Sequence, residues 1–199
     1  MRVSLIGWVG DDVDEVLAEA ERSPAVTHNH PEGIKGAQAT ALAVYLAREG
    51  ESKQAIRQEI ATRFGYDLSR TPEEVRPSYR FDVTCQGSVP ESLIAFFESE
   101  SYEEAIRKAI SLGGDADTMS CIAGGVAEAF YGGIPDGTEA EARHRLPGDL
   151  AHIVVAFYAR FVRWGADLLG RTMHHSPICS VRLAVHGLCR GWSIAMRVW

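Results

Sequence analysis

The sequence of 199 residues has little of several features that mark common protein classes. No apolar run reaches the ~18 residues that a membrane-spanning helix needs. The N-terminus has no basic stretch followed by an apolar core, so a secretory signal peptide is not expected. The four cysteines show no CxxC or zinc-ribbon spacing, and Cys121, in a run of small residues, is expected to be buried. We therefore expect a cytoplasmic protein with reduced thiols.

Positive charge is also scarce over most of the chain. The net charge of −7 argues against a general nucleic-acid binder, because such proteins carry a basic face. The charge is uneven, since residues 160–199 contain six arginines and a single acid. Residues 164–199 show no sustained hydrophobic period and hold three of the four tryptophans. We interpret this segment as an atypical basic tail outside the fold, and a basic partner-binding arm is the alternative.

Strand-like alternation is missing as well, apart from a short run at residues 80–84. Helical spacing and helix-ending glycines are present almost throughout. Capping boxes are expected at residues 71–74 and 101–104, where Thr or Ser is followed three residues later by Glu. The sequence predicts an all-α fold, with helices over residues 11–22, 31–50, 51–64, 71–77, 90–99, 101–113, 118–131 and 147–163.

The stretch SLGGDADTMSCIAGG, residues 111–125, is the most informative chemical feature. Two glycines, ending with Gly114, allow a sharp turn out of one helix, and Thr118 can cap or open the next. Asp115 and Asp117 lie one residue apart and repel each other unless water or a cation lies between them. Two carboxylates and a hydroxyl suit a hard cation such as Mg²⁺ or Ca²⁺. Helix capping in a solvated turn is the alternative.

Three other acid-rich sites do not fit this stretch. An EF-hand loop starting at Asp115 needs Gly at its sixth position and Glu at its twelfth, where the chain has Ser120 and Val126. An aspartyl-phosphate phosphatase needs its acids after a hydrophobic strand, and a helix is expected here. The carboxylates of a glycosidase normally come from separate elements rather than from one turn.

A second candidate is the stretch THNHPEG, residues 27–33, before the helix that begins at Pro31. His28 and His30 form an HxH pair, which binds zinc in amidohydrolase barrels. The chain lacks the strand–helix alternation that such a barrel requires. His28 could instead meet a phosphate near the free N–H groups of a helix start. A capping or packing histidine is the alternative.

Taken together, VTHNHPEGIKGAQATALAVYLA and AISLGGDADTMSCIAGGVAEAFYGGIP resemble the ADP-ribosylglycohydrolase family. The stretches GSVPESLIAFFESESYEEAIRKA and LPGDL also look like that family, and the resemblance covers residues 1–163. It implies an all-α hydrolase with a two-Mg²⁺ centre that removes ADP-ribose from modified protein side chains or small acceptors. It implies that Asp115, Asp117 and Thr118 are metal ligands and that His28 and Gly114 bind substrate. It assigns no catalytic residue.

The chain departs from the family pattern in one important respect. The family's other metal-binding acids lie in a Thr-Asp-Asp motif near its N-terminus, and the chain has none; Asp11 and Asp12 look like a helix cap instead. Met1 resembles an internal methionine, so the chain resembles the C-terminal portion of the enzyme. We therefore expect an incomplete ligand set, weak Mg²⁺ binding and poor hydrolysis. A non-catalytic α-helical ADP-ribose-binding or structural relative is the alternative. The expected partner is an ADP-ribosylated protein or a small ADP-ribose conjugate, without membrane or nucleic acid.

Overall fold

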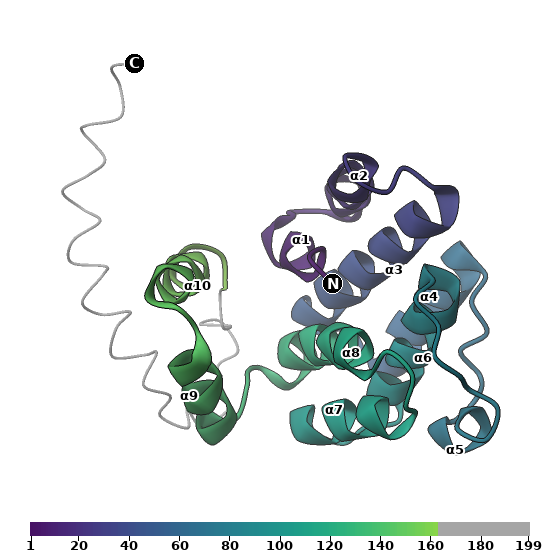
Figure 1. The fold of residues 1–199 in the computed structure, drawn as a ribbon. Helices are drawn as coiled ribbons and strands as arrows, with labels where there is room; N and C mark the ends of the chain where they lie inside the picture. The colour runs from purple at the N-terminus through teal and green to yellow at the C-terminus, as the bar shows by residue number, and fades with distance from the viewer. Residues whose placement is uncertain (163–199) are drawn as a thin grey trace. The chain divides into compact units, whose positions relative to one another are not determined.

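The structure, a computed structural model, describes residues 1–162. These residues form ten α-helices and no β-strand, which confirms the all-α prediction (Figure 1). The chain divides into two compact units, Met1–Pro135 and a second unit that begins at Asp136. The boundary that the sequence predicts at residue 163 stays a prediction, and the basic tail at 164–199 lies outside the described residues.

Eight helices make up the first unit. They are α1 (Ser4–Val9), α2 (Val13–Ala25), α3 (Pro31–Arg48), α4 (Lys53–Phe64), α5 (Pro72–Val75), α6 (Cys85–Phe97), α7 (Tyr102–Ser111) and α8 (Ala116–Tyr131). The long helices lie close to their predicted positions, whereas α1 had not been predicted.

The helix boundaries follow from local capping. The Asp12 carboxylate accepts a hydrogen bond from the Glu15 N–H, as expected of a cap, and Ser52 does the same for α4. Thr71 and Glu74 form the complete capping box that the sequence predicts. Helix α4 ends at Gly65, whose φ of 66° lies in the left-handed region that favours glycine.

The predicted start of α6 and the predicted capping box of α7 need correction. Helix α6 begins at Cys85 rather than near residue 90, because Thr84 caps it and Pro90 lies inside the helix. Burial of the whole stretch from Ser88 to Phe97 stabilises α6 despite the backbone hydrogen bond that proline cannot make. At α7 the box is half formed: Ser101 accepts from the Glu104 N–H, but the Glu104 carboxylate accepts from the N–H of Glu100. Residues 80–84 are not a strand.

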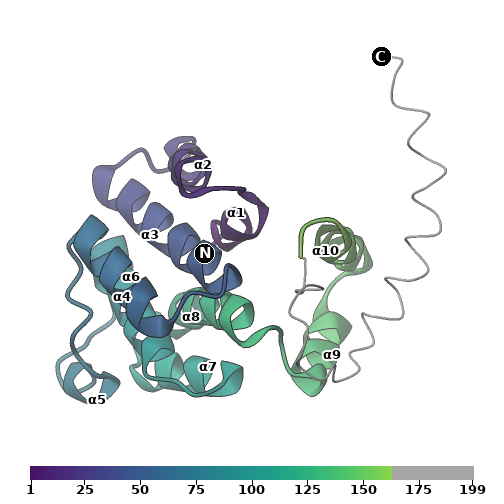
Figure 2. The same cartoon turned by 180° about the vertical axis from the view of Figure 1, so that it is seen from behind.

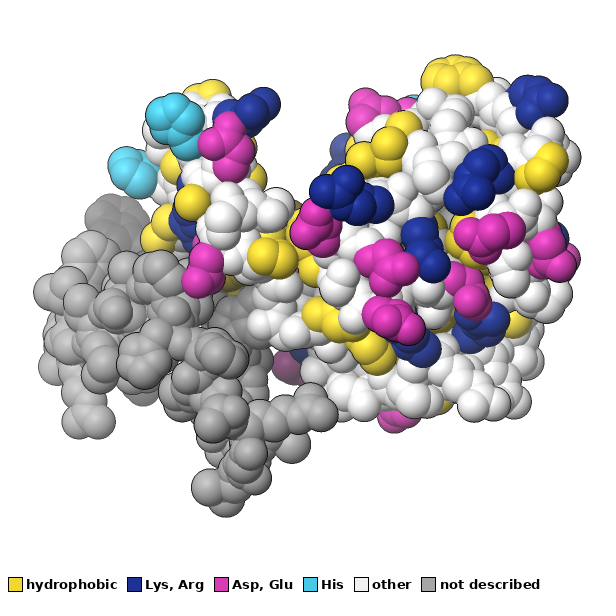
Figure 3. Space-filling model, turned by 90° about the horizontal axis from the view of Figure 1, so that it is seen from below, with side chains coloured by type: hydrophobic (Ala, Val, Ile, Leu, Met, Phe, Trp, Pro, Cys, Tyr) yellow, Lys and Arg dark blue, Asp and Glu magenta, His cyan; other side chains and the backbone are white. Residues whose placement is uncertain are grey.

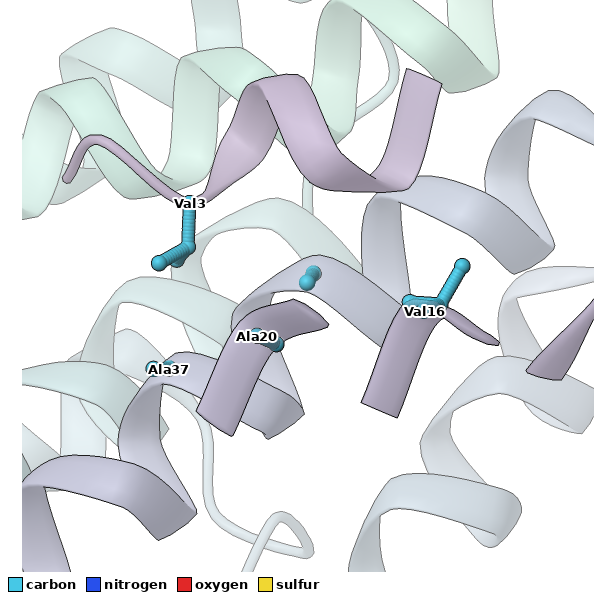
Figure 4. Close-up of a cluster of buried hydrophobic side chains, with 5 residues drawn as sticks. Val3, Val16, Ala20 and Ala37 are labelled. Carbon is cyan, nitrogen blue, oxygen red and sulfur yellow. The ribbon is translucent and has the colours of Figure 1, made fainter. Parts of the chain in front are cut away.

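Helix α3 lies at the centre of the first unit, between α1 and α2 on one side and α4 and α6 on the other (Figures 1 and 2). Small residues allow the neighbouring helices to approach it closely. A Cβ added at Gly7 of α1 would lie 2.5 Å from the carbonyl oxygen of Ala41. Around this contact, buried apolar side chains from α2, α3 and the residue before α1 form a cluster: Val3, Val16, Ala20, Ala37 and Ala41 (Figure 4).

Helix α8 is also central, as its small residues predict. It packs against α3, α6 and α7, and Met119, Ala123 and Val126 are buried. Cys121 is the exception, because it is exposed and the expectation of a buried thiol is wrong. The run of small residues around it led to that expectation, but α8 also has exposed positions, and Cys121 occupies one of them. In Figure 3, acidic and basic side chains are interspersed over the visible face of the first unit.

The second unit contains α9 (Asp136–Arg145) and α10 (Gly148–Phe161). Helix α9 had not been predicted, and α10 corresponds to the helix expected from Pro147. Neither helix has a buried residue, and Leu150 and Ile153 of α10 are exposed. None of the helices in residues 1–162 is both long enough and apolar enough to cross a bilayer.

Candidate functional site

The site predicted around the two aspartates is a tight turn between α7 and α8. Gly113 has a φ of 78° and Gly114 a φ of 67°, both in the left-handed region that other residues rarely adopt. A side chain at Gly114 is also excluded by space, because an added Cβ would lie 2.6 Å from Cε1 of Tyr79. The turn therefore requires glycine at Gly114 both for its backbone angle and for the space that the tyrosine ring occupies.

Asp115 and Asp117 come together directly after this turn. Asp115 occupies the N-cap position of α8, but its carboxyl makes no capping hydrogen bond. The carboxyl group of Asp115 is instead a close neighbour of the Asp117 carboxyl. This neighbour, followed by the backbone N–H groups of Thr118 and Asp117, lowers the pKa of Asp117. The two carboxyl groups are thus neighbours on one exposed turn, as the one-residue spacing predicts.

Thr118 lies beside this carboxyl pair, in the first turn of α8. Thr118 does not cap α8, since the helix already begins at Ala116. Its backbone N–H donates a hydrogen bond of 3.0 Å to Oδ1 of Asp117. Its side chain is half-buried.

The oxygen atoms of these three residues are the type of ligand that a hard cation prefers, but there are too few of them for a complete site. All three groups offer oxygen, and the N-terminal end of a helix stabilises negative charge. Within residues 1–162, however, no cluster of three or more His, Cys, Asp or Glu side chains could hold a metal ion. Asp115, Asp117 and Thr118 can therefore contribute to the coordination of one cation, while a two-metal centre needs ligands from further helices.

The segment after α5 holds the turn in place. The Arg76 guanidinium donates hydrogen bonds of 3.1 and 2.9 Å to the carbonyl and hydroxyl of Ser111, the last residue of α7. Three residues later, the Tyr79 ring packs on Gly114, and the Arg80 carbonyl lies 3.4 Å from the position of an added Cβ there. Figures 1 and 2 show α5 on the same side of the unit as the α7–α8 turn. Sequence reasoning missed these residues, because no local signal links positions that lie 35 residues apart.

His28 and His30 have different roles at the start of α3. The His30 ring nitrogen accepts a hydrogen bond of 3.2 Å from the Glu32 N–H and so caps the helix. His28 is exposed, and its Nδ1 lies 2.9 Å from the Thr27 hydroxyl. No hydrogen bond or ion pair among the described residues joins His28 to the carboxylate turn. The structure thus brings together the predicted metal ligands and Gly114, but not His28.

A groove of about 610 Å³ lies near the same end of α3. Pro31, Ile34 and Lys35 of α3 line it, together with Leu17 of α2 and Phe64 of α4. None of the predicted site residues lines this groove. It is therefore separate from the carboxylate turn.

Comparison with known proteins shows which family contains both the carboxylate turn and the segment around His28. The model of the ADP-ribosylglycohydrolase family matches residues 1–167. The chain belongs to the ADP-ribosylglycohydrolase family. The match confirms the resemblance seen in the sequence, and it includes the carboxylate turn and His28.

Individual relatives are more distant. The chain is 29% identical over 177 aligned positions to ADP-ribosylhydrolase ARH3 of Homo sapiens, covering 66% of this chain and 49% of that protein. It is 28% identical to ADP-ribosylhydrolase ARH3 of Gallus gallus, covering 66% and 48% respectively. An uncharacterized protein of Archaeoglobus fulgidus is 28% identical over 151 positions, covering 68% of this chain and 50% of that protein. The chain thus spans about half the length of the relatives it matches.

Proposed function

We propose that the chain forms part of a Mg²⁺-dependent hydrolase that removes ADP-ribose from modified protein side chains or small acceptors. The observation that supports this proposal is the pair of neighbouring carboxyl groups, Asp115 and Asp117, directly after a glycine turn, in a member of the ADP-ribosylglycohydrolase family. The relatives named ADP-ribosylhydrolase ARH3 support the same reaction class. The cytoplasmic location expected from the sequence belongs to the same proposal.

In this proposal each residue has a defined part. Asp115, Asp117 and Thr118 would hold the cation, and a bound cation would act as a Lewis acid toward the ribose oxygens and an attacking water. Gly114 offers its backbone to the ADP-ribose unit, because the Tyr79 ring occupies the space that a side chain would fill. His28, exposed before α3, contacts the substrate. The bond that breaks is the glycosidic bond of ADP-ribose to its acceptor, and water supplies the new hydroxyl.

A second candidate function is binding of ADP-ribose without turnover. The small donor set favours it, because three oxygen groups from one turn are fewer than a two-metal centre requires. On this alternative, the chain recognises an ADP-ribosylated partner and hydrolyses it slowly or not at all.

Two measurements on the purified chain test the proposal. Mg²⁺ binding is followed by calorimetry, and release of ADP-ribose is followed from ADP-ribosyl-arginine. We expect weak Mg²⁺ binding and slow release, both abolished in Asp115→Asn and Asp117→Asn. Asp14→Asn is the matched control, because Asp14 also lies in the first turn of a helix but on α2. Release that is unchanged in both site variants contradicts the metal proposal.

The same variants separate the two candidate functions. If both variants still bind ADP-ribose with unchanged affinity and the wild type releases none, the binding function is supported. If both lose ADP-ribose affinity together with Mg²⁺ affinity, the hydrolase proposal is supported.

A further inference from the structure

Tyr79 combines a close contact with the carboxylate turn and a buried hydroxyl. The ring atom nearest to the Cβ position of Gly114 is Cε1, at 2.6 Å, whereas Cδ1 lies at 3.4 Å. Because Cε1 is bonded to the carbon that bears the hydroxyl, the hydroxyl end of the ring is the end that faces the turn. Gly114 directly precedes Asp115, so Tyr79 contacts the backbone that places the first predicted metal ligand.

The Tyr79 hydroxyl is buried and has no hydrogen-bond partner among the described residues. Burial raises the pKa of Tyr79, and the negative charges of Asp82, Glu91 and Asp115 raise it further. The phenolic O–H is a hydrogen-bond donor, and the carboxyl groups of Asp82, Glu91 and Asp115 lie in the same region. Such unpartnered buried donors are rare in folded proteins, since each costs stability.

Glu91 provides a second observation in the same region. Its side chain is 8% exposed, and Oε1 accepts a hydrogen bond of 2.8 Å from Arg70. The other oxygen, Oε2, is buried and has no hydrogen-bond partner in the part of the chain that the structure describes. The Tyr79 hydroxyl, a donor, and Glu91 Oε2, an acceptor, thus both lack a hydrogen-bond partner among the described residues.

We propose that Tyr79 is a positioning residue for the Asp115 turn: its ring fixes Gly114, and its hydroxyl is a donor for the carboxylates of the cation-bound turn. This inference rests on the proposed function, because it assumes that Asp115 and Asp117 hold a divalent cation. It explains why a tyrosine is present where phenylalanine would fill the same space without an unpartnered hydroxyl. Arg76 acts with Tyr79, because its guanidinium donates hydrogen bonds to Ser111, which lies just before the glycine turn.

Tyr79→Phe separates stability from metal binding. Removal of an unpartnered buried hydroxyl is expected to raise the melting temperature by about 2–4 °C. The same change is expected to lower Mg²⁺ affinity roughly tenfold, as loss of a hydrogen bond to a charged group does. A purely structural tyrosine would give the stability gain with no change in affinity.

Tyr66→Phe is the matched control. The Tyr66 hydroxyl is also buried without a partner among the described residues, but its ring lies under Lys35 and away from the turn. We expect a similar rise in melting temperature and unchanged Mg²⁺ affinity. Equal Mg²⁺ affinity in Tyr79→Phe, Tyr66→Phe and the wild type overturns the role of the hydroxyl.

Hydrogen exchange tests the role of the ring independently of metal binding. We expect Tyr79→Leu to speed amide exchange over residues 112–118 at least about tenfold, with α2 and α3 unchanged. Unchanged exchange in that segment overturns the positioning role. If the wild type binds no Mg²⁺ at all, the proposed metal function and the role of the hydroxyl both fail, and the exchange result still decides the role of the ring.

Discussion

Arg70 and Glu91 form an ion pair in which Nη2 of the arginine lies 2.8 Å from Oε1 of the glutamate, whose side chain is 8% exposed. The pair joins the segment before α5 to the buried helix α6. Burial raises the pKa of Glu91, and the hydrogen bond and charge of Arg70 oppose that rise. Arg70 therefore offsets part of the free-energy cost of burying the charged Glu91 carboxylate.

Arg70→Met is expected to destabilise the protein by about 2 kcal/mol at neutral pH, because it leaves a buried carboxylate without its partner. The expected loss is smaller than that for a fully buried ion pair, because the Arg70 side chain is 38% exposed. Urea unfolding measures the change. Arg22→Met, at an exposed pair with Glu19, is the control and should change stability little.

The pH dependence of Arg70→Met gives a further check on Glu91. A carboxyl whose pKa is raised by folding binds more protons in the folded state, so its contribution to stability falls as the pH rises through that pKa. The loss in Arg70→Met should therefore shrink as the pH is lowered toward 4.5, the ordinary glutamate value. A loss that is constant with pH contradicts this account.

Gly114→Ala is expected to destabilise the protein more than Gly65→Ala. The two glycines have φ values of 67° and 66°, so the backbone strain of about 1 kcal/mol is the same in both. Nothing lies within 4 Å of a Cβ at Gly65, whereas one at Gly114 would meet the Tyr79 ring. The difference, about 1–2 kcal/mol by chemical unfolding, measures that steric contact. Equal losses would show that the ring yields freely.

Lys53→Met is expected to cost about 2 kcal/mol, because the ammonium joins the end of α6 to the end of α8. Its Nζ donates hydrogen bonds of 3.1 Å to the Phe96 carbonyl and 2.9 Å to the Tyr131 hydroxyl, and it also contacts the Ser99 carbonyl. Thermal unfolding measures the loss. Lys108→Met, at a pair within α7, is the control, and an equal effect of the two changes argues against the prediction.

Glu104→Gln should reduce the acid sensitivity of the protein. A hydrogen bond from the Glu100 N–H, followed by one from Lys108, lowers the pKa of Glu104 below its ordinary value of 4.5. A lowered folded-state pKa means that the stabilisation is present above pH 4.5 and is lost as the pH falls through the folded-state pKa. Unfolding curves between about pH 6 and about pH 3 should therefore fall more steeply for the wild type than for the variant. Glu103→Gln, one position earlier, is the control.

Local signals in the sequence were enough for eight of the ten helices of residues 1–162 and for the carboxylate pair. Capping residues such as Asp12 and Thr71 act within four residues, so their hydrogen bonds can be predicted from spacing alone. The glycine turn before Asp115 is equally local. The predicted start of α6 was wrong because burial stabilises the helix despite Pro90 in its interior. The predicted burial of Cys121 was wrong because exposure depends on which helices are neighbours.

The sequence by itself thus determined the all-α class, the family and the turn that brings Asp115 and Asp117 together. Only the tertiary structure decided what surrounds that turn. Arg76 reaches Ser111 and Tyr79 reaches Gly114 across 35 residues of chain, through packing that leaves no periodic or local trace in the sequence. The glycine turn places the two aspartates next to each other. Contacts between distant parts of the chain place the Tyr79 ring on that turn, with its hydroxyl buried and without a hydrogen-bond partner among the described residues.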